Sequence, residues 1–158
     1  MKKILAYTFL SATFLLSGVL ENSYTKEDFE KIDNRSGEEI AKEYVENENK
    51  KLPIKQDEIT EITKIIAINT KIYFIKEINK NKKTKSKKLT LQEMYESTRS
   101  YLCKNTLNRA YIDKKNLGFQ YDHYESNTKE YIGSYSIDKN DCIKMEQEQK
   151  SKGKYSLY

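Results

Sequence analysis

The sequence predicts an α+β fold in which a small four-stranded antiparallel sheet, made of two hairpins, packs against two helices and carries one disulfide. Two strand-like pairs rich in Ile, Thr and Tyr each follow a helical stretch with an N-terminal cap. The chain holds only two cysteines, Cys103 and Cys142. Hydrophobic residues make up 37% and charged residues 34%, a composition that supports a folded chain with long solvated segments.

The first predicted helix begins at Ser36-Gly37-Glu38-Glu39, where acidic residues occupy the first turn. Apolar residues then recur at helical spacing: Ile40, Ala41, Tyr44 and Val45. Pro53 biases Leu52 toward an extended conformation, so we expect this helix to end before it.

The first predicted hairpin pairs residues 58–68 with residues 71–78 through a turn at Asn69-Thr70. Alternation along the second strand places Ile72, Phe74 and Ile78 on one face together with Lys76. Tyr73 and Ile75 lie on the opposite face. Both faces of this hairpin are therefore partly apolar.

The second predicted helix begins at Thr90, which forms a capping box with Glu93. Its apolar stripe has Cys103 at its edge and consists of Leu91, Met94, Tyr95, Thr98, Tyr101 and Leu102. Asn105 or Thr106 can cap a further helical turn, which Asn116 and Gly118 would end.

The second predicted hairpin runs over residues 119–124 and 131–137 and returns Cys142 to the helix that carries Cys103. Residues 36–142 then form a single domain, preceded by a linker at 21–35 and followed by a polar, at most weakly helical tail at 143–158.

The N-terminus has the features of a secretory signal peptide, which we assign to residues 1–20. Lys2 and Lys3 precede the apolar run 4–16, and small residues follow. Leu15-Leu16-Ser17-Gly18 is similar to the start of a lipoprotein signal, but Val19 occupies the place of the lipidated cysteine. We expect a periplasmic protein; the alternative is inner-membrane anchoring by an uncleaved N-terminal segment, the only membrane contact foreseen.

Export favours a disulfide between Cys103 and Cys142, whereas in the cytosol the same two cysteines would be free thiols. Closing this loop stabilises the fold by about 4 kcal/mol in the chain-entropy model. Two cysteines and one distant histidine do not match a tetrahedral zinc site, so no metal is expected.

No catalytic or cofactor-binding pattern is present, and we expect neither an enzyme nor a bound cofactor. The only histidine, His123, lies between Asp122 and Tyr124, but neighbours on a strand point to opposite faces. The five glycines form no phosphate-binding loop. A net charge of +5 is too small to indicate a nucleic-acid-binding protein.

Two surfaces remain as candidates for binding. The first is a sheet face bearing Tyr121, Tyr131 and Tyr135, since tyrosine contributes large rigid area to interfaces; the alternative is that these rings fill the core. The second is the basic run 76–88, whose candidate contacts are Lys82, Lys83, Lys85, Lys87 and Lys88; the alternative is a solvated loop.

Several segments resemble a largely uncharacterised family of small exported bacterial envelope proteins with a helix-to-strand disulfide. These segments are Leu52-Pro53, the hairpin around residues 60–74, Tyr101-Leu102-Cys103, Leu117-Gly118-Phe119-Gln120-Tyr121 and Asp141-Cys142. The turn after Tyr124 departs from the family, because Asn127-Thr128 stands where Asp-Gly is usual. The resemblance implies an envelope protein and transfers no functional residue.

The favoured hypothesis is therefore a non-enzymatic envelope protein that acts by binding another envelope protein. The alternative is an inhibitor, immunity or exclusion-type protein that blocks an exported enzyme or a conjugation or secretion system.

Overall fold

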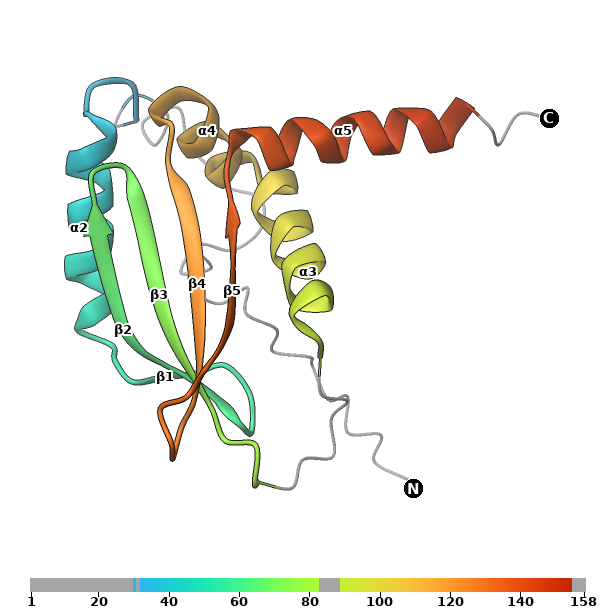
Figure 1. Ribbon diagram of the computed structural model, residues 1–158. Helices are drawn as coiled ribbons and strands as arrows, with labels where there is room; N and C mark the ends of the chain where they lie inside the picture. Colours follow the sequence, from blue (N-terminus) through green and yellow to red (C-terminus); the bar gives the residue numbers. More distant parts are fainter. Residues whose placement is uncertain (1–29, 31, 83–88, 155–158) are drawn as a thin grey trace, which may run out of the picture.

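A computed structural model describes residues 30, 32–82 and 89–154 (Figure 1). The predicted signal segment 1–20 and most of the predicted linker 21–35 lie outside the described residues. The described elements follow in the order α2 (Gly37–Asn49), β1 (Ile54–Lys55), β2 (Thr60–Ile68), β3 (Lys71–Ile78), α3 (Leu91–Lys104), α4 (Thr106–Lys115), β4 (Gly118–Glu125), β5 (Tyr131–Ile137) and α5 (Lys139–Lys154).

The strands form one five-stranded mixed sheet in the order β1-β2-β3-β4-β5. The prediction of a four-stranded antiparallel sheet is wrong on two counts. A short strand, β1, pairs with β2 at one edge, and β3 pairs with β4 in parallel, from Lys71 opposite Gly118 to Ile78 opposite Glu125. The two predicted hairpins themselves, β2–β3 and β4–β5, are confirmed.

The parallel pairing follows from the connection between the two hairpins. A parallel neighbour needs a crossover that returns the chain to the starting end of the previous strand, and helices usually supply it. Here α3 and α4 occupy that connection. The left-handed C-cap of α4 at Asn116, with φ 54°, then turns the chain into Gly118 at the start of β4.

The expected helix starts are confirmed. Ser36 caps α2 and Thr90 caps α3, each in a capping box with the glutamate three residues later. The Thr90 hydroxyl accepts from the Glu93 amide at 3.2 Å, and the Glu93 carboxylate accepts from the Thr90 amide at 2.8 Å.

The expectation of two helices is wrong, because the described residues also form α4 and α5. Residues 143–154, expected to be a polar tail, belong to α5. Asp138 accepts hydrogen bonds from the amides of Asn140 and Asp141 at 2.7 and 3.3 Å, while Asp141 accepts from the Asp138 amide at 2.9 Å. This reciprocal cap starts a helix directly after β5.

Cys142 therefore lies in a helix rather than at the end of a strand. Its disulfide partner is Cys103 of α3, with the two Cα atoms 5.2 Å apart. The bond joins α3 to α5, so the helix-to-strand disulfide implied by the resemblance is corrected to a helix-to-helix one.

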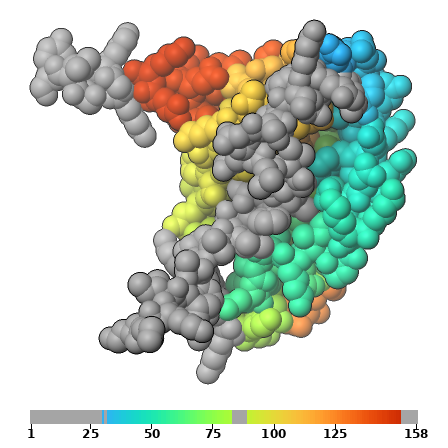
Figure 2. All heavy atoms as spheres, turned by 180° about the vertical axis from the view of Figure 1, so that it is seen from behind, coloured from blue at the N-terminus to red at the C-terminus, as the bar shows by residue number. Residues whose placement is uncertain are grey.

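α2 and α3 pack on one face of the sheet, whereas α5 projects away from it (Figure 1). Figure 2 shows the molecule from behind. α2 packs mainly on β2, and α3 packs on β5. The sheet residues that point toward this helix-covered face form one side of the core: Ile62, Ile65, Ile72, Phe74, Phe119, Tyr121 and Ile137. No described helix packs on the opposite side of the sheet, which we call the open face.

Candidate functional site

The open face carries aromatic and aliphatic side chains from four neighbouring strands, in two groups separated by the register position of Ile75 and Asp122. Strand pairing places Ile66 beside Tyr73 and Tyr124 beside Tyr131. The rings of Tyr124 and Tyr131 meet edge to face, with centroids 5.5 Å apart. Tyr131 is 54% exposed, and so is Ile68 at the end of β2. Exposed tyrosine and isoleucine side chains on one face of a sheet are typical of a protein-binding surface.

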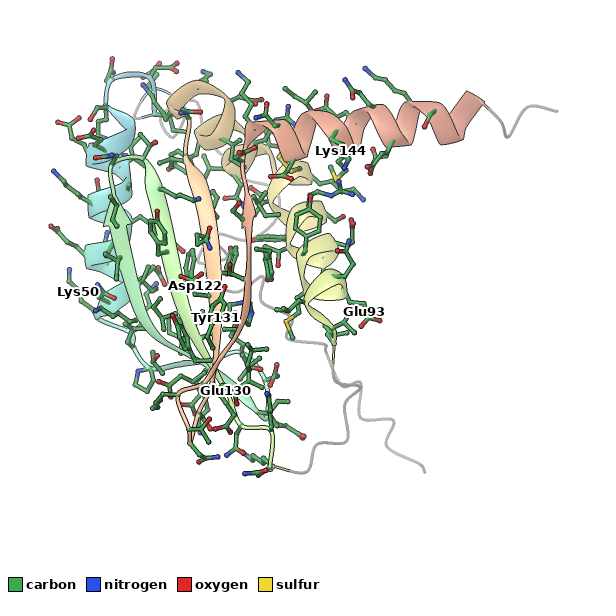
Figure 3. All side chains as sticks on the ribbon, in the orientation of Figure 1. Lys50, Glu93, Asp122, Glu130, Tyr131 and Lys144 are labelled. Atoms are coloured by element: carbon green, nitrogen blue, oxygen red, sulfur yellow. A yellow bond between two sulfur atoms is a disulfide. The ribbon has the colours of Figure 1, made fainter. Side chains whose placement is uncertain are left out.

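Polar side chains on the open face are bonded mostly to one another. Lys129 pairs with Glu77 at 2.7 Å, and Gln120 donates to Asp122 at 2.8 Å. The Lys71 ammonium lies 5.7 Å from the centroid of the Tyr73 ring. Figure 3 labels Asp122 and Tyr131 on this part of the sheet. Both charge signs are thus present, which favours a protein partner of mixed charge rather than a polyanion.

The structure separates the three tyrosines that were predicted to share one face. Tyr121 is only 5% exposed, and its ring stacks on Phe74 at 4.8 Å and contacts Tyr135 at 5.1 Å. Burial raises the pKa of Tyr121 well above its usual value and the pKa of Tyr135 to about 12. Both rings therefore belong to the core beneath the helices.

Tyr131 lies on the open face because the β4–β5 register is irregular. His123 opposes Gly133, yet Tyr124 opposes Tyr131, so one residue of β5 is skipped between the two pairs. Such a bulge reverses the face that simple alternation predicts. Sequence reasoning also did not propose Tyr73 and Tyr124 as binding residues. Strand alternation alone places both side chains opposite the core.

The second predicted contact surface, the lysine run, is described only in part. Lys82 is exposed. Lys83, Lys85, Lys87 and Lys88 lie outside the described residues, so the basic contact stays a prediction.

A polar pair lies buried on the helix-covered face. Lys76 of β3 and His123 of β4 are register partners, and they are 2% and 0% exposed. The Lys76 ammonium lies 4.6 Å from the centroid of the Tyr121 ring, and the His123 ring lies 5.4 Å from that of Tyr135. Strand alternation in the sequence already placed Lys76 on the same face as Ile72 and Phe74. A lysine on an apolar strand face was the signal that could have predicted this buried polar pair.

Burial shifts both groups toward their neutral forms. It lowers the pKa of Lys76 to about 7, and the charge of Asp57 opposes this. Burial, followed by the charge of Lys76, lowers the pKa of His123 to about 4. At neutral pH His123 is therefore an uncharged imidazole beside a lysine that gains and loses its proton readily.

A second buried cation, Arg99 of α3, is paired. Its guanidinium donates to Glu96 at 2.7 Å and to Glu148 of α5 at 2.9 Å. Burial alone would lower the pKa of Arg99, but the hydrogen bond to Glu148 and the neighbouring negative groups raise it. Close by, the Tyr95 hydroxyl donates to Asp141 at 2.7 Å. These contacts and the disulfide hold α5 against α3.

Within the described residues, no cluster of His, Cys, Asp and Glu is arranged to hold a metal ion. Likewise, none of the helices in the described part is long and apolar enough to cross a bilayer.

Neither a family model nor a curated protein sequence matches this chain. Solved structures do share its fold. The pilotin EpsS of the Vibrio vulnificus type 2 secretion system matches with a TM-score of 0.55 and 14% identity, over 75% of this chain and 97% of the pilotin chain. The type II secretion system pilotin AspS of Vibrio cholerae matches with a TM-score of 0.53 and 16% identity, over 73% and 96%.

A third structure, from Pseudomonas aeruginosa and described as a secreted protein, matches with a TM-score of 0.52 and 14% identity, over 76% of this chain and 99% of its own. At these identities the likeness shows a common fold. The matched part accounts for almost the whole of each neighbour, so the fold described above is the complete fold of those proteins.

Proposed function

We propose that this chain is an exported, non-enzymatic accessory protein of the bacterial envelope, similar in role to a secretion-system pilotin, and that it works by binding another envelope protein. The open face is the proposed binding surface. The observation that carries the proposal is a set of aromatic and aliphatic side chains that no described helix covers: Ile66, Ile68, Tyr73, Tyr124 and Tyr131.

The composition of this set of open-face side chains supports binding. Large aromatic side chains contribute most of the energy of protein interfaces, and they lose little conformational entropy when they are buried. The sheet beneath is stiffened on its other side by the stacked rings of Phe74, Tyr121 and Tyr135. The surface is therefore preorganised, which lowers the entropic cost of association.

The chemistry of the site also favours binding over catalysis. The two thiols are joined in the disulfide, and the single imidazole is buried within the helix-covered face. Among the solved structures that share the fold, two are named as type II secretion pilotins.

Site-specific photo-crosslinking in envelope preparations tests the proposal. A benzophenone amino acid replaces Tyr73 or Tyr124 on the open face in separate variants. Matched controls carry it at Lys50, beyond the end of α2, or at Lys144 on α5, both exposed and distant from the open face (Figure 3). We expect both open-face positions to form an adduct with the same envelope protein and both controls to form none.

Adducts from Lys50 or Lys144 alone would overturn the choice of the open face. The absence of any envelope adduct from all four positions would overturn the proposed binding function. The role in secretion is tested separately by comparing the exported proteins of cells with and without the gene, where an unchanged profile contradicts a pilotin-like role.

A further inference from the structure

The buried pair of Lys76 and His123 is polar in a place where the fold does not require polarity. Both side chains point to the core side of adjacent central strands, between the regions that α2 and α3 cover. Phe74 and Tyr121 lie two residues earlier on each strand, and the buried Glu125 lies two residues after His123. A methionine and a phenylalanine would fill the same volume without loss of hydration, so the two polar groups need another explanation.

No ion pair joins Lys76 to an acidic group among the described residues, and two acidic residues of this region accept hydrogen bonds from backbone amides. Asp57 accepts from the amides of Ile59 and Thr60, both at 2.8 Å. Glu125, the next acidic residue along the same face of β4, accepts from the Asn127 and Thr128 amides at 2.7 and 2.6 Å. Both carboxylates stabilise their own turns, and of the two only the charge of Asp57 raises the pKa of Lys76.

His123 is also unsatisfied. Neither of its ring nitrogens makes a hydrogen bond with the described residues, although the carbonyls of Tyr121 and Gly133 lie close enough to favour its charged form slightly. Leaving a buried donor or acceptor unpaired costs about 1–3 kcal/mol. Such groups are rare in folded proteins and commonly mark the place of a ligand or an ordered water.

We propose that Lys76 and His123 form a binding site for a single carboxylate. One carboxylate oxygen accepts from the Lys76 ammonium and the other from an N–H of the His123 ring, which satisfies both groups with charge-assisted or neutral hydrogen bonds. One cation balances one negative charge, and the surrounding Phe74, Tyr121 and Tyr135 rings disfavour an uncompensated second charge. A monoanion therefore fits better than a phosphate dianion.

Glycine at position 133 lets α3 pack closely on the strand that pairs with the His123 strand. Gly133 is the partner of His123 on β5 and has φ 152°, a conformation that other residues rarely adopt. A Cβ atom there would collide with the Leu91 side chain from the first turn of α3. The absence of a side chain thus lets Leu91 pack directly against β5 at the position opposite His123.

The single histidine makes the site directly observable. With histidine labelled by ¹³C, the full chain gives one imidazole signal, from His123. Sodium acetate is titrated at pH 7 against sodium chloride of equal ionic strength. We expect a saturable shift with acetate and none with chloride, and a Lys76→Met variant that binds acetate at least about tenfold more weakly. Lys71→Met, which removes a lysine of the open face, serves as the control and retains the shift.

A peptide ending in a free carboxylate, compared with its C-terminal amide, distinguishes the two sources of the ligand. Tighter binding of the peptide acid than of acetate, with no binding of the amide, assigns the site to a protein carboxylate; binding of acetate alone assigns it to a small free acid. The proposal is overturned if no carboxylate shifts the His123 signal, or if Lys76→Met, shown to be folded by thermal unfolding, responds like the unmodified chain. This outcome does not depend on the open face.

Discussion

Two cations buried in this protein, Arg99 and Lys76, have opposite surroundings. The Arg99 side chain is 8% exposed and contacts two carboxylates, one of them from α5. Lys76 is 2% exposed, and its described contact is the face of the Tyr121 ring. Arg99 therefore has a structural task that its contacts explain, whereas Lys76 does not.

The difference matters because the energetics of the two groups have opposite signs. Removing a buried charge that has hydrogen-bonded partners strongly destabilises the fold, because the partners are left unpaired. A buried lysine without an anion costs stability for as long as it is charged. The chain retains the second arrangement in its central strands, which is the pattern expected where stability has been exchanged for function.

The largest expected effect comes from the disulfide, which reinforces the region around Arg99. Replacing both Cys103 and Cys142 with alanine lowers the free energy of unfolding by about 4 kcal/mol, because the unfolded chain regains the entropy of a loop spanning 39 positions. Urea unfolding measures the loss, and added reductant has no effect on the variant. A loss below about 1 kcal/mol would mean that the Arg99 contacts and apolar packing hold α5 on their own.

The second largest expected effect on stability comes from replacing Lys76. Lys76→Met raises the free energy of unfolding by about 3 kcal/mol at pH 7, because it removes the desolvation of a buried ammonium. The folded pKa of Lys76 is about 7, below the usual 10.5, so between these values the unfolded chain binds more protons. The contribution of Lys76 to stability therefore rises from about pH 7 to about pH 10.5, and the advantage of the variant shrinks over that range.

Urea unfolding of Lys76→Met and of the exposed control Lys71→Met at several pH values measures this prediction. The control stays within about 0.5 kcal/mol of the unmodified chain at each pH. A Lys76→Met variant that is less stable than the unmodified chain at pH 7 would show that the lysine has a stabilising partner.

Arg99→Met is expected to have the opposite sign and a smaller size. It lowers the free energy of unfolding by about 2 kcal/mol, less than for a fully buried pair because Glu96 and Glu148 keep 47% and 41% of their side-chain exposure. A double-mutant cycle with Glu148→Gln isolates the bond between α3 and α5. Additive effects of the two substitutions would contradict the coupling inferred here.

The smallest expected effect tests the tyrosines on the two faces. Tyr135→Phe removes the hydrogen bond of 3.1 Å between its hydroxyl and Thr98 and lowers the free energy of unfolding by about 1 kcal/mol. Tyr131→Phe, on the open face, changes it by less than about 0.5 kcal/mol. Thermal unfolding compares the two variants, and equal effects would place both tyrosines in similar surroundings.

Much of the local structure could be predicted, because short-range chemistry determines it. Ser36 with Glu39 and Thr90 with Glu93 are capping boxes in the sequence and in the structure. Asp138 with Asp141 has the same spacing, and recognising it would have predicted α5 and corrected the position of Cys142. The candidate site was predicted less well, since one skipped residue in β5 separates Tyr131 from Tyr135.

By itself the sequence determined the two hairpins, the helix starts and the inward orientation of Lys76, because caps, turns and strand alternation act over a few residues. Only the tertiary structure decided that β3 and β4 lie parallel, because that pairing depends on how α3 and α4 return the chain across the sheet. The same pairing brings Lys76 beside His123, from positions far apart in the chain, and so creates the buried polar pair that no local pattern contains.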